Sequence, residues 1–161
     1  MTNPTARAGL RVRGIDTALA DRIRATLADD FGNTLHVWTN DAPRSNPCRH
    51  CLRLTDPGED LILFALCPFD TTGPYAEAGP VFVHANPCEP YAAYDRFPPD
   101  FLERSLTLRA YDAEGRIRDA EVAPPGGSGV ALDRLFVDER VLFVHVRNPA
   151  WGCYDVRVDR A

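Results

Sequence analysis

Apolar and polar residues alternate at the start of the chain and then recur with a helical period. Residues 10–15 (LRVRGI) alternate leucine and valine with arginine, which predicts a half-buried strand. Asp16 can cap the helix that follows, and Gly32 with Asn33 can end it. The apolar residues of that helix recur every four positions at Leu19, Ile23, Leu27 and Phe31. Residues 34–39 (TLHVWT) alternate again and predict a second strand.

The middle of the chain contains two further predicted strands. Residues 48–54 (CRHCLRL) alternate so that an extended conformation places Cys48 and Cys51 on opposite faces. A turn separates this segment from residues 61–69 (LILFALCPF), which are apolar without alternation. Such a run is typical of a strand covered on both faces, so we place it in the centre of a sheet.

The second half of the chain adds short strands and helical turns with short connections. The predicted elements are a strand at 81–85, a helical turn at 98–105, a hairpin at 105–123, a helix around Leu132, Leu135 and Phe136, and strands at 141–148 and 153–160. Short connections favour antiparallel neighbours. We therefore predict the α+β class, with a strongly bent, mostly antiparallel sheet of about eight strands and two or three short helices.

The composition predicts one domain over residues 10–161, preceded by a flexible N-terminus at residues 1–9. A chain of 161 residues can bury a core, and shares of 45% hydrophobic and 25% charged residues are ordinary for globular proteins. Nothing approaches the ~18 consecutive apolar residues of a membrane span or the pattern of a signal peptide, so we expect a cytoplasmic protein. Its five cysteines are then expected to stay reduced.

The charged residues exclude several classes of function. All 18 basic residues are arginine, and without lysine the chain can form neither a phosphate-binding loop of the G-x-x-x-x-G-K-[ST] type nor a Schiff base. The net charge is −5 and the arginines are dispersed among acids. We therefore expect no nucleic-acid partner.

Four segments together resemble a family of small bacterial proteins known as a domain of unknown function. They are CRHCLRL…PGEDLILFALCPF, GPYAEAGPVFVHA, LTLRAYDAEGRIRDAEV and HVRNPAWGCYDVRVDRA, and the resemblance spans roughly residues 10–161. It implies a cytoplasmic, single-domain bacterial protein without an established activity. It also implies that Cys51 varies within the family, which argues against zinc because a structural zinc site depends on all its ligands.

A zinc site is nevertheless one interpretation of the cysteines. Cys48, Cys51, His84 and Cys88 have the spacing C-x2-C…H-x3-C, which can supply four ligands for tetrahedral zinc. The competing interpretation makes Cys48 and Cys51 small buried residues of a strand. We favour the second interpretation and expect no cofactor, with zinc as the alternative.

A catalytic cysteine is a second hypothesis. Cys153 lies across a short connection from the predicted strand that carries His145, and a thiolate beside an imidazole can act as a nucleophile. A glycine before a cysteine is more often a turn that enters a strand.

The third hypothesis is a cleft for a small anionic molecule near residues 71–84. Catalytic candidates are Tyr75, Glu77, His84 and His145, and ligand-binding candidates are Arg49, Arg109, Tyr111, Arg147 and Cys153. Arginine can pair with a carboxylate or phosphate, and histidine can transfer protons near neutral pH. The competing interpretation is a solvated strand face with ordinary surface arginines and tyrosines.

We therefore predict a binding protein for a small anionic molecule, or a cofactor-independent enzyme that acts on one, with no membrane partner. One alternative is a zinc-stabilised interaction module that uses Cys48, Cys51, His84 and Cys88. The other is an accessory protein-binding subunit without catalysis, which should expose an apolar patch around Trp38 or Trp151. The sequence leaves open both the oligomeric state and whether a reaction is catalysed.

Overall fold

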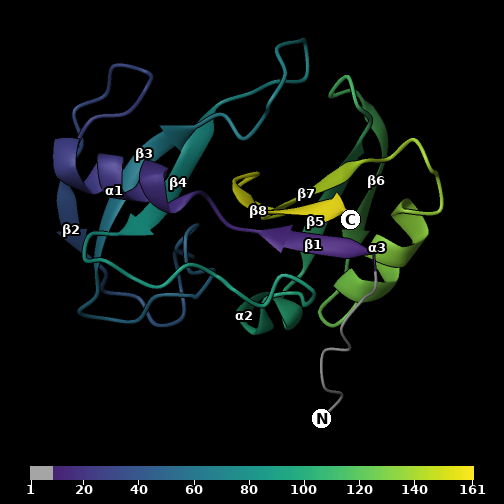
Figure 1. Cartoon of the computed structure of the whole chain (residues 1–161). Helices are drawn as coiled ribbons and strands as arrows, with labels where there is room; N and C mark the ends of the chain where they lie inside the picture. Colours follow the sequence, from purple (N-terminus) through teal and green to yellow (C-terminus); the bar gives the residue numbers. More distant parts are fainter. Residues whose placement is uncertain (1–8) are drawn as a thin grey trace. The chain divides into compact units, whose positions relative to one another are not determined.

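Eight strands and three helices form between residues 9 and 161, the part of the chain described by this computed structural model (Figure 1). All pairs of named strands are antiparallel, which confirms the α+β class. The strands lie in a five-stranded and a three-stranded sheet, so the single bent sheet that we predicted is divided in two. No helix in this part of the chain is long and apolar enough to cross a bilayer.

The described residues form two compact units. The first contains residues 9–13, 68–77 and 92–161, and the second contains residues 14–67 and 78–91. Two such units can belong to one domain, so the single domain expected over residues 10–161 stays a prediction. The flexible N-terminus predicted at residues 1–9 lies, except for Gly9, outside the described residues.

The first unit contains the five-stranded sheet, in the order β1-β8-β7-β5-β6. Its elements are β1 (Leu10–Arg13), α2 (Pro99–Leu102), β5 (Leu106–Tyr111), β6 (Ile117–Ala123), α3 (Ser128–Leu135), β7 (Phe143–Arg147) and β8 (Tyr154–Arg160). The predicted hairpin is β5 with β6, and the predicted helix around Leu132 and Leu135 is α3. α3 packs against β5 and β6.

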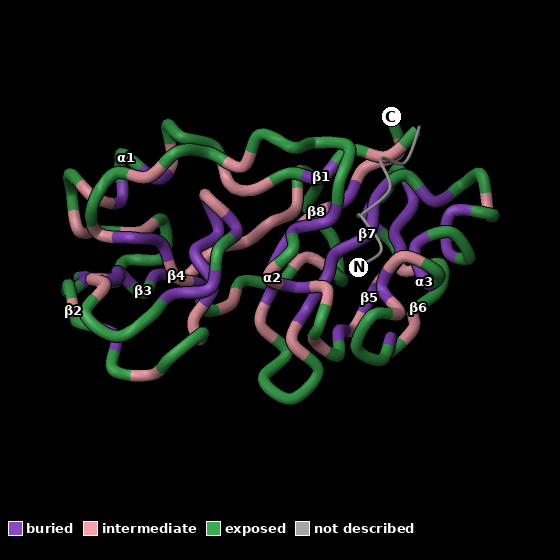
Figure 2. Tube along the Cα trace, turned by 90° about the horizontal axis from the view of Figure 1, so that it is seen from below, coloured by how far each residue is buried: buried purple, intermediate pink, exposed green. Residues whose placement is uncertain are grey.

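Alternation along the strands gives this sheet one aliphatic face and one polar face that also carries aromatic residues. The aliphatic face buries Leu106, Leu108, Val144, Val146, Val156 and Val158. The polar face carries Arg109, His145 and Arg157 as cross-strand neighbours on β5, β7 and β8. Figure 2 shows long buried stretches in β7 and β8, whereas the connecting loops are largely exposed. The central position of β7 explains why all five of its residues are buried.

The second unit contains α1 (Thr17–Thr26) and the strands β2 (Val37–Thr39), β3 (Asp60–Leu66) and β4 (Gly79–His84). The sheet order is β2-β3-β4, which confirms the central position predicted for the apolar run. α1 packs against β3 (Figure 1) and buries Ala20 and Ile23.

The predicted helix forms where the sequence indicates but is shorter than predicted. α1 ends before Leu27, which has a left-handed backbone (φ 47°) and donates its N–H to the Ile23 carbonyl. The Asp29 carboxylate then accepts the N–H groups of Phe31 and Asn33, which holds a turn in place of a further helical turn. Phe31 is consequently half exposed and does not extend the apolar face of the helix.

The strand predicted at residues 48–54 is wrong. The Cys48 N–H donates to the Arg53 carbonyl (2.9 Å), and the Leu52 N–H donates to the Cys48 carbonyl (2.8 Å). These two bonds close a tight turn, so the faces expected from strand alternation do not exist. Only Cys48 forms a bridge to a strand, next to Phe82 of β4.

Candidate metal centre

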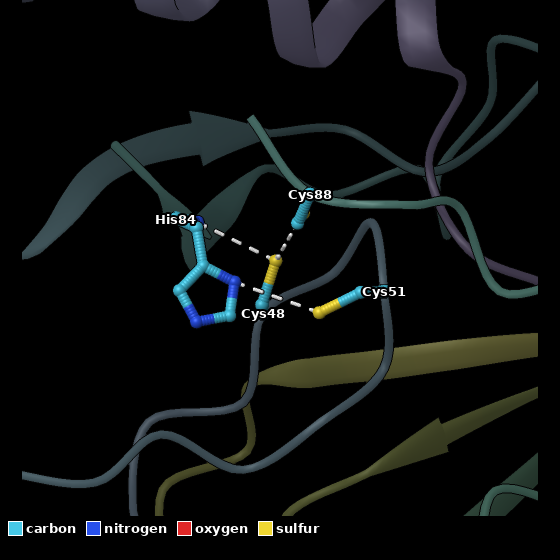
Figure 3. A group of neighbouring side chains, drawn as sticks. All are labelled: Cys48, Cys51, His84 and Cys88. Atoms are coloured by element: carbon cyan, nitrogen blue, oxygen red, sulfur yellow. Dashed lines mark hydrogen bonds between the residues drawn. The ribbon is translucent and has the colours of Figure 1, made fainter. Parts of the chain in front are cut away.

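Three cysteines and one histidine converge in the second unit. Cys48 and Cys51 lie in the tight turn, His84 is the last residue of β4, and Cys88 lies four residues beyond it. The four candidate ligand atoms all lie within 4.8 Å of one another. Figure 3 shows the side chains of Cys51, His84 and Cys88 arranged around the sulfur of Cys48. The cluster could therefore hold a single metal ion.

Backbone hydrogen bonds position the two cysteines of the turn. Leu52, directly after Cys51, has a left-handed backbone (φ 58°), which brings its N–H back to Cys48. The Arg49 N–H donates to the Phe82 carbonyl (2.9 Å) and fastens the turn to β4. Gly14 lies against the other side, where a Cβ atom would stand 2.7 Å from the Arg49 carbonyl oxygen. The turn is thus held from both sides.

Two of the distances between ligand atoms match the edges of a tetrahedron around zinc. Zn–S and Zn–N bonds of about 2.3 and 2.05 Å give tetrahedral edges of about 3.8 Å for S···S and about 3.5 Å for S···N. The Sγ atoms of Cys48 and Cys88 are 3.9 Å apart. Cys51 Sγ lies 3.5 Å from His84 Nδ1. These two edges therefore need almost no rearrangement to accept an ion.

The cluster already favours negative charge on sulfur. Hydrogen bonds from Cys51 and Cys88 lower the pKa of Cys48 far below its ordinary value, whereas Cys88, on the donor side of its bond to Cys48, has a raised pKa. Hydrogen bonds to Cys48 and then Cys51 raise the pKa of His84 to about 10. The backbone N–H of His84 also donates to Cys48 Sγ (3.4 Å). A thiolate beside an imidazolium is an arrangement in which a metal cation can replace the proton.

Glu59 supports the ring of His84 from the side away from the cysteines. Its Oε1 lies 3.4 Å from His84 Nε2, close enough for an ion pair although the ring nitrogen lacks a hydrogen bond of good geometry. Arg53 and the backbone N–H of Asp56 both donate to the Glu59 carboxylate, at 3.0 and 2.7 Å. Partial burial opposes ionisation, but these donors lower the pKa of Glu59 below its ordinary value. A carboxylate behind a ligating imidazole fixes its tautomer and orientation.

Two further residues connect the cluster to α1. Arg24 donates from Nη2 to Cys88 Sγ (3.3 Å) and from Nε to the His84 carbonyl (3.0 Å). His50 Nδ1 lies 3.2 Å from Cys88 Sγ, and its Nε2 lies 2.8 Å from the Thr17 hydroxyl. Burial lowers the pKa of His50, so its ring is neutral at pH 7 and can bridge the thiol and the hydroxyl. The contacts of Arg24, Glu59 and Thr17 were missed by the sequence analysis because each depends on a long-range approach.

The candidates for an anion site separate into two groups. Glu77, Arg109, Tyr111, His145 and Arg147 belong to the first unit, whereas Arg49 and His84 belong to the second. In the first unit the Glu77 carboxylate lies 2.8 Å from a nitrogen of each of the two arginines, and the rings of Tyr111 and His145 are 5.0 Å apart. Arg49 is buried and donates to the Pro47 carbonyl. Tyr75 is 45% exposed.

His145 lies inside an aromatic cluster. Its ring contacts Phe69, Tyr111, Phe143 and Tyr154, with centroids 4.7 to 5.1 Å away. Burial, followed by the charges of nearby arginines, lowers the pKa of His145 to about 2. Within residues 9–161 no hydrogen bond joins it to Cys153, whose thiol lies 3.9 Å from the Trp151 carbonyl. The catalytic roles proposed for His145 and Cys153 stay predictions.

A pocket of about 520 Å³ lies elsewhere in the second unit. Its lining is formed by Asp29, Asn33, Thr34, Leu35, His36, Trp38, Leu63, Phe64, Ala65, Gly79 and Pro80. Only the last two belong to the region 71–84 where a cleft was expected, and none of the predicted ligand-binding side chains lines it.

Comparisons with known proteins place the chain in a family. Neither a search of curated proteins nor a search of solved structures gave a match. A family profile described as "Protein of unknown function (DUF1203)" matches residues 45–160, a range that includes all four residues of the cluster. Because the match covers more than half of the chain and agrees with the resemblance in its sequence, the protein belongs to the DUF1203 family.

Proposed function

We propose that the second unit is a zinc-binding module in which Cys48, Cys51, His84 and Cys88 hold one Zn²⁺ ion. The observation that carries this proposal is the proximity of the four ligand atoms, all within 4.8 Å of one another. Thiolate and imidazole ligands in a tetrahedral arrangement are those that zinc prefers in proteins. This choice reverses the preference drawn from the sequence, which rested partly on a strand that the chain does not form and partly on the variation of Cys51 implied by the family resemblance.

The role of the ion is structural. Four protein ligands fill a tetrahedral shell and leave no open position for water or substrate, unlike a catalytic zinc site. The ion joins the turn at Cys48 and Cys51 to the end of β4 and to the segment that carries Cys88. Since these segments are far apart in sequence, metal binding contributes directly to the folding free energy of the unit.

Charge also supports zinc in this position. One Zn²⁺ with three thiolates has a net charge of −1, and the Arg24 guanidinium donates directly to Cys88. Arg53 is held nearby through its bond to Glu59. Cationic donors around a thiolate-rich site reduce its net charge and stabilise the ionised sulfurs.

The test is the metal content of the full chain purified without a histidine tag from cells supplied with zinc. We expect about one zinc per chain, and about none in the Cys48→Ser and Cys88→Ser variants. Cys67→Ser and Cys153→Ser are matched controls, because both thiols lie outside the cluster and should leave the zinc content unchanged. Cobalt substitution should give the absorption of tetrahedral cobalt with thiolate ligands, and this absorption should be lost with Cys88→Ser.

A zinc content near zero, together with no uptake of added zinc by the reduced protein, would show the proposal to be wrong. Iron must be measured on the same samples, because a tetrahedral sulfur-rich site can also hold iron. One equivalent of iron without zinc would mean that the four residues form a metal site that holds iron and not zinc.

A further inference from the structure

A pair of arginines in the first unit shares one carboxylate oxygen. Arg109 Nη1 and Arg147 Nη2 each lie 2.8 Å from Oε1 of Glu77. The two arginines project from the neighbouring strands β5 and β7 on the polar face of the five-stranded sheet. The carboxylate comes from the loop of residues 68–77, which belongs to the same unit. The arrangement is that of an anion bound between two guanidinium groups.

The arginine pair is incompletely satisfied by Glu77. The Arg147 side chain is only 7% exposed, and its Nη1 donates to the Gly152 carbonyl (3.0 Å). Its buried Nε has no hydrogen-bond partner in the part of the chain that the structure describes, and Nη2 reaches Glu77 without good hydrogen-bond geometry. A buried guanidinium with unused donors favours a ligand that has more acceptor atoms than one carboxylate oxygen offers.

Among the described residues, direct ion pairs leave Arg109 and Arg147 with one carboxylate between them. Arg157 is paired with both Asp70 and Asp159, and Asp159 also pairs with Arg13. These two arginines and two aspartates balance one another. Arg109 and Arg147 then bring two positive charges against the single negative charge of Glu77. A group with two negative charges would balance the pair in place of Glu77.

We propose that Arg109 and Arg147 form a binding site for a phosphate group, which Glu77 occupies in the free protein. A phosphate group carries close to two negative charges at pH 7 and three acceptor oxygens, which matches both the charge and the unused donors. This site is independent of the zinc module. A phosphate group is one kind of the small anionic molecule that the sequence predicts as a partner.

The loop is built so that Glu77 can leave while the rest of the loop stays. Phe69 packs edge-to-face on Tyr111 and His145, and Asp70 pairs with Arg157. The start of the loop is therefore anchored by two independent contacts. Within the described residues, the ion pairs of Glu77 run through its carboxylate, and its side chain is half exposed.

The experiment compares inorganic phosphate binding by the full chain and its variants, measured by calorimetry at constant ionic strength. Glu77→Gln removes the competing charge while keeping the shape, so it should bind phosphate about tenfold more tightly or better, because affinity is reduced by the fraction of closed sites. Adding Arg109→Gln to this variant should abolish the gain. Arg109 is chosen because it is more exposed than Arg147 and its loss threatens the fold less.

Glu121→Gln is the matched control, because Glu121 pairs with Arg134 away from the site and its loss changes the net charge equally. Phenyl phosphate, as a simple monoester, distinguishes a phosphorylated molecule from free phosphate as the preferred source, and acetate should bind more weakly than either. Thermal midpoints with and without phosphate check that each variant is folded.

Equal phosphate affinity in Glu77→Gln and Glu121→Gln would overturn the proposal, as would a gain that survives Arg109→Gln. Neither outcome affects the zinc content, so failure here is separable from failure of the zinc module.

Discussion

The Nδ1 atom of His84 lies 3.5 Å from the Sγ atom of Cys51, although the two residues are 33 positions apart in the chain. One sits at the end of a strand and the other in a turn whose backbone is fixed by hydrogen bonds to Arg53 and Phe82. The two are therefore brought together by the folding of the unit, and an ion between them closes a loop that the unfolded chain leaves open. Metal affinity and fold stability must then change together.

Removal of the metal should destabilise the protein. A ligand present at 1,000 times its dissociation constant stabilises the native state by about 4 kcal/mol, so a strong chelator should lower the thermal midpoint and added zinc should restore it. Differential scanning calorimetry of the reduced protein provides the measurement. Cys153→Ser should respond as the wild type does, whereas Cys88→Ser should be insensitive to chelator. A chelator response in Cys88→Ser would contradict the assignment of this ligand.

Glu59→Gln should weaken zinc binding without changing the stoichiometry. Its carboxylate faces Nε2 of His84 and loses its charge in this variant, and loss of such an outer contact typically costs 10–100-fold in affinity. Competition with a chromophoric chelator measures the change. Asp41→Asn is the control, since Asp41 is exposed and the variant has the same net charge. Equal affinities for both variants would mean that Glu59 does not support the ring.

His145 should make the protein sensitive to acid. Burial lowers its pKa from 6.5 to about 2, so below pH 6.5 this histidine binds a proton in the unfolded chain but not in the folded protein. Above pH 6.5 the imidazole is neutral in both the folded and the unfolded protein, so its protonation does not affect stability. As the pH falls from 6.5 towards 2, the free energy of unfolding decreases progressively. The slope from this one group is about 1.4 kcal/mol per pH unit.

The His145→Phe variant tests this assignment, because a phenyl ring suits the aromatic cluster and cannot be protonated. Urea unfolding at pH 7.5, 6.0 and 5.0 should show the wild type losing stability relative to the variant only at the two lower values. A constant difference across the three values would mean that His145 is not the titrating group.

Replacing Leu52 by glycine should destabilise the protein less than replacing it by alanine. Leu52 is buried, so both changes remove apolar contacts and destabilise the protein by roughly 2–5 kcal/mol. Its φ of 58° is strained for alanine and free for glycine, which should make Leu52→Gly the more stable variant by about 1 kcal/mol. Urea unfolding at saturating zinc measures the difference. If alanine is the more stable, the turn after Cys51 does not have this backbone conformation.

Local patterns were sufficient to predict most of the sheets. Apolar residues alternate with polar ones in much of β5, β7 and β8, and the apolar run of β3 lies in the central strand of its sheet. The four members of the cluster were also identified from spacing, because ligand pairs separated by two and by three intervening residues are a property of the sequence itself.

The turn at Cys48 could not be recognised from its own residues. A left-handed backbone after the second cysteine is normally signalled by glycine, and here leucine holds it because the side chain is buried. The turn also depends on the hydrogen bond between Arg49 and Phe82, which lie 33 positions apart. Contacts of this kind place Glu59 behind His84 and Glu77 between two arginines, and no periodicity of the sequence encodes them.

Gly14→Ala should disturb the metal centre from outside it. A Cβ atom at Gly14 would lie 2.7 Å from the carbonyl oxygen of Arg49 and 2.8 Å from that of His50, and neither backbone group can yield without moving the turn. The Arg49 carbonyl also accepts the N–H of Ile15 (2.8 Å), so the two segments cannot separate without losing this bond. We expect a loss of about 1–3 kcal/mol in stability and weaker zinc binding, because the turn that carries Cys48 and Cys51 is displaced.

Gly79→Ala in the same unit is the matched control: nothing lies within 4 Å of its added Cβ, so unfolding in urea and chelator competition should both stay close to the wild type. Wild-type zinc affinity in a destabilised Gly14→Ala protein would show that this contact supports the fold of the unit without positioning the ligands.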